Sequence, residues 1–133
     1  MTTPFLSIDS INLTAANLDV SVVPTELKEA VPLDVDFNVQ VNPRPLAGES
    51  LVSEVTVNAT AKAKGERVFG VKTTFLVAAT VRDLNDAQVQ EIANFVLPNQ
   101  VIAFARATIA DLAVRTGYPA VLMPFIQLAP EAR

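Results

Sequence analysis

The side chains that most often carry out catalysis are missing from this chain. It has 133 residues and contains no histidine, no cysteine and no tryptophan. Without histidine there is no imidazole to act as a general base or metal ligand, and without cysteine there is no thiolate nucleophile, disulfide or common zinc site. We therefore expect a protein that is not an enzyme and that uses no cofactor and no metal.

A few other residues have types that could do chemistry. Asp34 and Asp36 are paired carboxylates that could act in acid–base catalysis or bind a hard cation, but no third ligand is suggested nearby, so solvated strand residues are the better interpretation. Gly65 and Gly70 have the spacing of the outer glycines of a phosphate-binding loop, but the Lys-Ser/Thr pair does not follow them. The lone Tyr118 is interpreted as a packing aromatic rather than a general acid.

The formal charge divides the chain into two parts. The net charge is −4, which argues against nucleic acid or an anionic membrane surface as a partner. Residues 1–54 carry eight acidic and two basic side chains, whereas residues 55–133 carry six acidic and eight basic ones. We interpret this as solvated faces of opposite sign, with an acidic surface for a basic partner as the alternative.

Neither a targeting segment nor a membrane span is predicted. The first residues include no basic side chain and no long apolar run, and no stretch approaches the roughly 20 apolar residues of a spanning helix. We therefore expect a cytoplasmic protein with no membrane insertion.

Alternation of apolar and polar residues predicts strands in the first part of the chain. The clearest run covers residues 33–41, and similar runs cover 51–64 and 68–81, although Thr73 interrupts the last of them. Residues 64–67 form a turn between the last two runs, so three strands form an antiparallel meander. The first strand, over residues 11–22, is less regular and is expected to be broken by a bulge near 15–17.

The period then changes to that of helices. Asn85 and Gln88 form an approximate capping box for a short helix over residues 86–95. Pro98 suits the first turn of a second, longer helix, and Gly117 is a natural cap at its end. Strands followed by helices indicate an α+β fold.

The end of the chain completes a single domain over residues 1–133. The tail, residues 120–128, is apolar and contains a proline, so we expect it to lie extended over the core. The long helix is rich in alanine, which lets another helix approach closely. We expect one face of it to cover the sheet and the other to meet a second subunit, giving a dimer or a tetramer.

Several short motifs near the end of the chain resemble the protein-export chaperone family SecB. These are Pro98-Asn99, Phe104-Ala105-Arg106, Arg115-Thr116-Gly117-Tyr118-Pro119 and the apolar run to Pro124. The resemblance implies a four-stranded antiparallel sheet with a short and a long helix packed on one face, and a homotetramer built as a dimer of dimers. It also implies a holdase that binds unfolded, partly folded or nascent polypeptides in apolar grooves without ATP, in protein export and transport.

The sequence departs from the family pattern after the second proline. Phe125-Ile126-Gln127-Leu128 replaces the usual Asn-Phe, and we expect the family's last helix to be missing. Delivery to SecA is therefore open, and an antitoxin is a further candidate partner. The alternative function is a structural, assembly or adaptor protein with this fold, linked to a toxin–antitoxin system or a phage and lacking general chaperone activity.

The residues expected to bind clients are apolar side chains near the crossover loop between the first two strands, on the helices and in the tail. Each of them could instead belong to the core. They are Leu46, Leu51, Phe95, Leu97, Val101, Phe104, Tyr118, Leu122 and Phe125.

Overall fold

The computed structural model describes residues 3–26, 32–118 and 128 of the chain. The strands are β1 (Phe5–Val20), β2 (Leu33–Pro43), β3 (Ser50–Ala63) and β4 (Glu66–Arg82), with a 3-10 turn, η1 (Pro24–Glu26), after β1. The helical segments are α1 (Asp86–Glu91), a π-helical turn η2 (Ile92–Val96) and α2 (Leu97–Val114).

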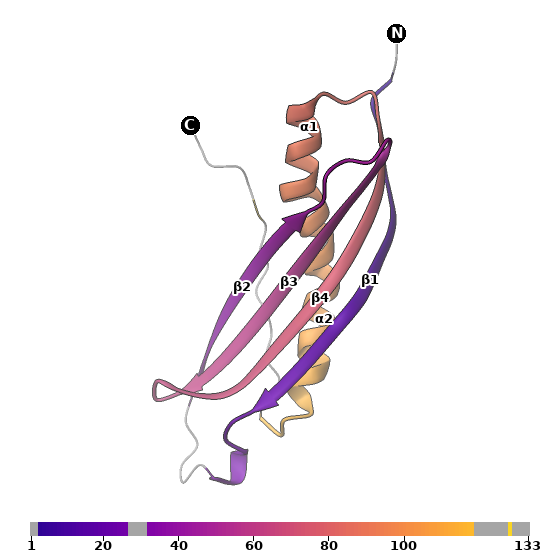
Figure 1. Cartoon of the computed structure of the whole chain (residues 1–133). Coiled ribbons are helices and arrows are strands. Elements are labelled where there is room, and N and C mark those ends of the chain that lie inside the picture. Colours follow the sequence, from indigo (N-terminus) through magenta and orange to yellow (C-terminus); the bar gives the residue numbers. More distant parts are fainter. Residues whose placement is uncertain (1–2, 27–31, 119–127, 129–133) are drawn as a thin grey trace.

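The four strands form one antiparallel sheet in the order β1-β4-β3-β2. The sheet forms one layer, and the helical segments lie behind it along one face (Figure 1). Consecutive strands β2, β3 and β4 are neighbours, whereas β1 pairs with β4, so the first strand of the chain lies beside the last. The predicted α+β fold is confirmed.

The alternation in the central strands separates a buried face from a wetter one. In β3 every second residue from Leu51 to Ala63 is buried, and in β4 the same holds from Phe69 to Val81. Thr73 belongs to the buried set and does not interrupt the strand. Its hydroxyl donates a hydrogen bond to the carbonyl oxygen of Val57 at 3.0 Å, which satisfies this polar group inside the core.

The first strand is longer than the sequence predicts. It begins at Phe5 rather than near residue 11, and its register against β4 shifts between Ile8 and Ser10 and again between Leu13 and Ala15. Each shift moves the following side chains to the opposite phase of the alternation. The apolar residues of β1 therefore do not follow one continuous alternation, which is why its first part looks irregular in the sequence.

The turn between β3 and β4 is confirmed as a two-residue hairpin. Lys64 and Gly65 both have positive φ angles, 50° and 80°. This is the backbone that matches the right-handed twist of the flanking strands, and glycine adopts it without strain.

The helical part is continuous, which corrects the prediction of two helices separated near Pro98. Asn85 and Gln88 form the expected capping box at the start of α1. At η2 the chain widens into a π-turn, in which the N–H of Leu97 donates to the carbonyl oxygen of Ile92, five residues back. Since Pro98 has no N–H to donate, this wider turn carries the helix past a residue that would break an ordinary α-helix.

The core lies between α2 and the sheet. One side of α2 contacts β4, β3 and β1, and its buried residues are Leu97, Pro98, Val101, Ile102, Ala105, Ile109 and Ala113. The inward residues of β2 are only half-buried although they pack against the same core. Leu128 is also half-buried against this core, and residues 120–127 of the expected extended tail lie outside the described part of the chain.

Candidate functional site

Four of the nine residues expected to bind clients lie in the core. Leu51, Leu97 and Val101 are at most 1% exposed and Tyr118 is 6% exposed. In this conformation none of the four presents an apolar side chain to a client. On α2 the reason is packing, because Leu97 and Val101 fall on the stripe that faces the sheet.

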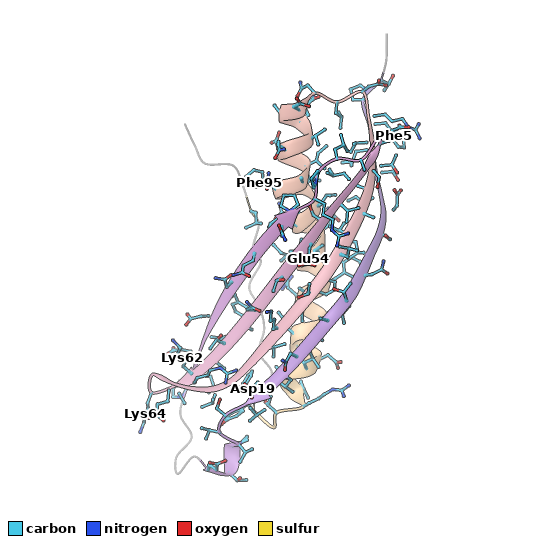
Figure 2. The ribbon with its side chains drawn as sticks, in the orientation of Figure 1. Phe5, Asp19, Glu54, Lys62, Lys64 and Phe95 are labelled. Atoms are coloured by element: carbon cyan, nitrogen blue, oxygen red, sulfur yellow. The ribbon has the colours of Figure 1, made fainter. Side chains whose placement is uncertain are left out.

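The other five residues fall into three groups. Leu46 is 43% exposed and Phe104 is 54% exposed, so both are available to a partner. Phe95 is half-buried in η2, a segment that contacts β2 (Figure 2). Leu122 and Phe125 lie outside the described residues, so their role stays a prediction.

Leu46 lies between two hollows at one end of the sheet, which together form what we call the Leu46 groove. The hollow on one side has a volume of about 480 Å³. It is lined by Pro43, Arg44, Pro45, Leu46, Leu51, Asp86, Val89, Gln90 and Ala93. The hollow on the other side, of about 330 Å³, is lined by Leu46, Gly48, Glu49, Val81, Arg82, Asp83, Leu84 and Val89.

The Leu46 groove has an apolar floor and a charged rim. Val89 of α1 lines both hollows and Leu51 of β3 closes one of them, and both side chains are buried. On the rim, Arg82 forms an ion pair with Glu49 at 2.6 Å, and its guanidinium carbon lies 4.6 Å from the centre of the Phe5 ring. Such a surface can bury apolar side chains without selecting for their shape, because hydrophobic burial has no direction.

The sequence suggested a binding surface near the loop between β1 and β2, but the Leu46 groove does not lie beside that loop. Leu46 lies in the loop after β2, at the end of the sheet where α1 begins. Tyr118 lies at the other end, where its hydroxyl donates a hydrogen bond to the carbonyl oxygen of Val22 at 2.5 Å. The predicted residues therefore do not form one continuous surface.

Tyr118 links the end of α2 to the segment after β1. Its ring packs against Phe69 with ring centroids 5.5 Å apart. Burial raises the pKa of Tyr118 above its usual value of 10.0, and the negative charge of Glu26 raises it further. These contacts give Tyr118 a structural role, in agreement with its interpretation as a packing aromatic.

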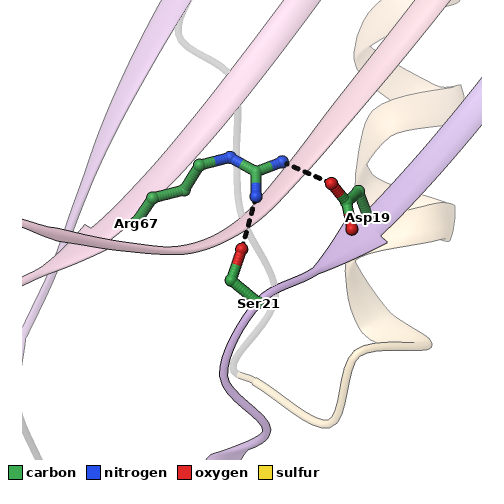
Figure 3. A network of polar contacts seen from close by, with 3 residues as sticks. All are labelled: Asp19, Ser21 and Arg67. Atoms are coloured by element: carbon green, nitrogen blue, oxygen red, sulfur yellow. Dashed lines mark hydrogen bonds and ion pairs between the residues drawn. The ribbon is translucent and has the colours of Figure 1, made fainter.

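Arg67 makes a second link at the same end of the sheet (Figure 3). Its guanidinium donates a hydrogen bond to the Ser21 hydroxyl at 2.5 Å and forms an ion pair with Asp19 at 3.4 Å. A Cβ atom on Gly70 would collide with this guanidinium, so a glycine at that position leaves the space that the arginine occupies. The end of β1 is thereby held to β4.

Ion pairs of this kind involve three of the eight acidic residues in the first part of the chain. Besides Asp19 with Arg67 and Glu49 with Arg82, Asp36 pairs with Lys62 at 3.8 Å. Each of these pairs joins an acidic residue from the first 54 positions to a basic residue from the later part. All of the partners are well exposed, so each pair contributes at most about 1 kcal/mol. The two charge classes therefore interleave, and these acids do not form a separate acidic surface.

Asn99 makes a contact that the sequence did not single out as functional. Its carboxamide nitrogen donates to the carbonyl oxygen of Leu128 at 2.9 Å, and its carboxamide oxygen accepts from the N–H of Leu128 at 2.7 Å. The only signal in the sequence was its place in the Pro98-Asn99 motif, which says nothing about the group that it binds.

Neither a metal centre nor a membrane-spanning helix is found in the described part of the chain. Within residues 3–26, 32–118 and 128, no three or more acidic, histidine or cysteine side chains are grouped so that they could hold a metal ion. No helix over the same residues is both long and apolar enough to cross a membrane.

Comparison with known proteins gives a consistent result. The family model described as "Preprotein translocase subunit SecB" matches residues 2–129. A protein-export protein SecB of Albidiferax ferrireducens is 35% identical over 124 residues, covering 89% of this chain and 76% of that protein. The SecB of Methylibium petroleiphilum is 28% identical over 118 residues, covering 89% and 72%.

The fold agrees with a solved structure of the same kind. The SecB-like chaperone of Mycobacterium tuberculosis, solved in complex with a peptide from an antitoxin, matches with a TM-score of 0.70 at 15% sequence identity. The match covers 91% of this chain and 90% of that one. Proteins of this family are chaperones rather than enzymes. With the family model matching nearly the whole chain, this chain belongs to the SecB family.

Proposed function

We propose that this chain is a chaperone that holds unfolded or partly folded polypeptides without ATP and has no enzymatic activity of its own. The observation that carries the proposal is the SecB family match over residues 2–129. The structural neighbour, a SecB-like chaperone with a bound peptide, supports polypeptide binding. A structural or assembly protein that only uses this fold is not favoured, because nothing in these comparisons points to it.

Clients bind in the Leu46 groove in this proposal. Leu46 stands between two hollows with an apolar floor. Among the expected residues that the structure describes, it is the one that is both exposed and next to a hollow. Full burial of a leucine side chain contributes about 1.5–3 kcal/mol. Since Leu46 is 43% exposed, a client that covers it gains a substantial part of that free energy.

The exposed side of α2 is the proposed contact between subunits. Phe104 is 54% exposed and Val114 is 58% exposed, and both lie on the side of the helix away from the core. On the same side Ala103 and Ala107 are exposed and small, so a second helix can approach closely. An exposed apolar patch on a helix marks a contact with a partner, although the exposed ion pair between Asp111 and Arg115 lies on the same side. We therefore propose a homodimer or a homotetramer.

Three finer predictions accompany the proposal. SecA as a partner, an antitoxin as a client and a cytoplasmic location rest on the family resemblance and on the sequence. The antitoxin peptide bound by the structural neighbour supports the second of them only as an example of a client.

The experiment is suppression of aggregation of a chemically denatured model protein as it is diluted into buffer. We expect the purified chain to suppress aggregation without ATP. Leu46→Ser should weaken suppression, whereas Leu13→Ser removes a leucine of similar exposure, 47%, from β1, outside the groove. Light scattering on both variants checks that the oligomeric state is unchanged. A wild-type chain that does not suppress aggregation would contradict the proposal, and equal effects of the two substitutions would contradict the groove.

A further inference from the structure

The contact between Asn99 and Leu128 has the hydrogen-bond pattern of a strand pair. One carboxamide donates to the carbonyl oxygen and accepts from the N–H of the same residue, at 2.9 and 2.7 Å. In an antiparallel sheet, a residue exchanges both of its backbone hydrogen bonds with one opposite residue in the same way. The Asn99 side chain therefore acts as a single residue of a neighbouring strand, presented from a helix.

Such a contact recognises the main chain rather than a side chain. Both groups that Asn99 binds are backbone groups, which every residue except proline carries. The Leu128 side chain is half-buried and packs against the core. The site thus combines a backbone contact that does not depend on sequence with the burial of one apolar side chain.

Other asparagines in the helical part behave differently. The carboxamide of Asn94 donates to the carbonyl oxygen of Gln90, one turn back in the same helix, and that of Asn85 caps α1. Of these described asparagines, Asn99 is the one whose carboxamide binds a distant part of the chain, 29 residues away.

We propose that Asn99 is a binding residue for the extended main chain of a client, and that Leu128 of the same chain occupies this position until a client displaces it. The inference rests on the proposed chaperone function. A chaperone whose clients share no sequence needs contacts that every polypeptide can make, and the backbone N–H and C=O are such groups. Leu128 shows which arrangement the site accepts: a residue whose backbone N–H and C=O both bind Asn99 and whose aliphatic side chain packs against the core.

The direct test measures the affinity of a short, end-blocked, fluorescent peptide of alternating leucine and serine by fluorescence anisotropy. In the variant Leu128→Pro, which has no N–H to donate to Asn99 and so competes less for the carboxamide, adding Asn99→Ala should raise the dissociation constant roughly two- to tenfold, the range expected for one net hydrogen bond. Asn94→Ala, which removes a carboxamide that stays within its own helix, should leave the dissociation constant unchanged. The same peptide with N-methylated leucines lacks the N–H that would donate to the carboxamide oxygen of Asn99. Methylation should therefore weaken binding to the wild type more than binding to Asn99→Ala.

Competition by Leu128 is tested with a pair of substitutions at that position. Leu128→Ala removes the side chain and keeps the N–H, whereas Leu128→Pro also removes the N–H that donates to Asn99. We expect Leu128→Pro to bind the peptide more tightly than Leu128→Ala, and we expect this difference to vanish in the Asn99→Ala background. Protection of the Leu128 amide from hydrogen exchange should fall when the peptide is added to the wild type, and this measurement needs no variant.

The outcomes separate this inference from the proposed function. If the wild type binds the peptide but Asn99→Ala and Asn94→Ala behave alike in Leu128→Pro, or if the Leu128 amide keeps its protection, the role of Asn99 is wrong and the chaperone function stands. If the wild type neither binds the peptide nor suppresses aggregation, both proposals fail.

Discussion

The hydroxyl group of Tyr118 joins the end of the helical part to the segment after β1, far away in the sequence. It donates to the carbonyl oxygen of Val22, while its ring packs against Phe69. Tyr118→Phe keeps the ring and removes the donor, so the Val22 carbonyl loses this partner. We expect the free energy of unfolding to fall by about 1–3 kcal/mol. Tyr118→Ala also removes the ring from a site that is 6% exposed, and should cost about 3–5 kcal/mol.

The same contact predicts a dependence on pH. Burial, and then the charge of Glu26, raise the pKa of Tyr118 above 10.0, so the folded state holds the phenol proton more tightly than the unfolded chain. The contribution of Tyr118 is therefore fully present below about pH 10, the unfolded value, and is lost as the pH rises through the folded pKa. In Tyr118→Phe this part of the alkaline loss of stability should be absent.

The composition of the chain makes the assay direct. Tyr118 is the only tyrosine and there is no tryptophan, so the ultraviolet absorbance of tyrosinate reports on this residue alone. We expect its titration midpoint in the folded protein to lie above the midpoint in denaturant. Denaturant unfolding followed by circular dichroism, at neutral and at alkaline pH, gives the free energies for the wild type and both variants.

Two results would refute this reasoning. One is a tyrosinate titration that is the same in folded and denatured protein, which would mean that the hydroxyl is not buried. The other is a Tyr118→Phe variant that unfolds at the same denaturant concentration as the wild type. Phe104→Leu, at an exposed aromatic on α2, is the control for the loss of aromatic character alone. Because Tyr118→Ala destabilises the fold, a loss of client binding in that variant would not identify Tyr118 as a client contact.

Two further predictions concern the subunit contact and the end of the sheet. Phe104→Asp should lower the oligomer mass measured by light scattering, because it places a charge on the exposed side of α2; an unchanged mass would show that this side is not the interface. Gly70→Ala should displace Arg67 and remove its ion pair with Asp19, lowering the free energy of unfolding by about 1 kcal/mol or less, since the pair is exposed. In an Arg67→Ala background the same Gly70→Ala change should have almost no effect, and a large effect there would mean that the added methyl group meets something else.

The sequence was sufficient for the features that depend on neighbouring residues. The alternation in β3 and β4, the Lys64-Gly65 turn and the Asn85 cap all follow from local spacing, and all are confirmed. The register shift between Leu13 and Ala15 lies beside the bulge predicted near residues 15–17. The earlier shift, between Ile8 and Ser10, was missed, because it puts the first apolar residues of β1 out of phase with the later ones. The helical path through Pro98 was also missed, since a π-turn depends on how η2 packs and leaves no simple pattern in the sequence.

The candidate site was harder to predict, because exposure is a property of the whole fold. Leu97, Val101 and Phe104 all lie on one helix and are all apolar, yet two of them face the sheet and the third faces away from it. Helical periodicity predicts that one side of α2 is apolar, but only the tertiary structure shows which residues of α2 face the sheet. The partner of Asn99 is 29 residues away, and no local rule connects the two positions.

The placement of β1 beside β4 has a consequence for how the chain folds. The β3–β4 hairpin closes over two residues and can form early, whereas β1 must find β4 across a long loop, with Phe5 opposite Arg82. Contacts between residues far apart in the chain form slowly, because loop closure costs entropy before they are made. In a chain made from its N-terminus, β1 leaves the ribosome before the strand that it needs, and it stays unpaired until β4 has been synthesised. We expect β1 to be the last strand to gain protection from hydrogen exchange during refolding and the first to lose it when the sheet opens.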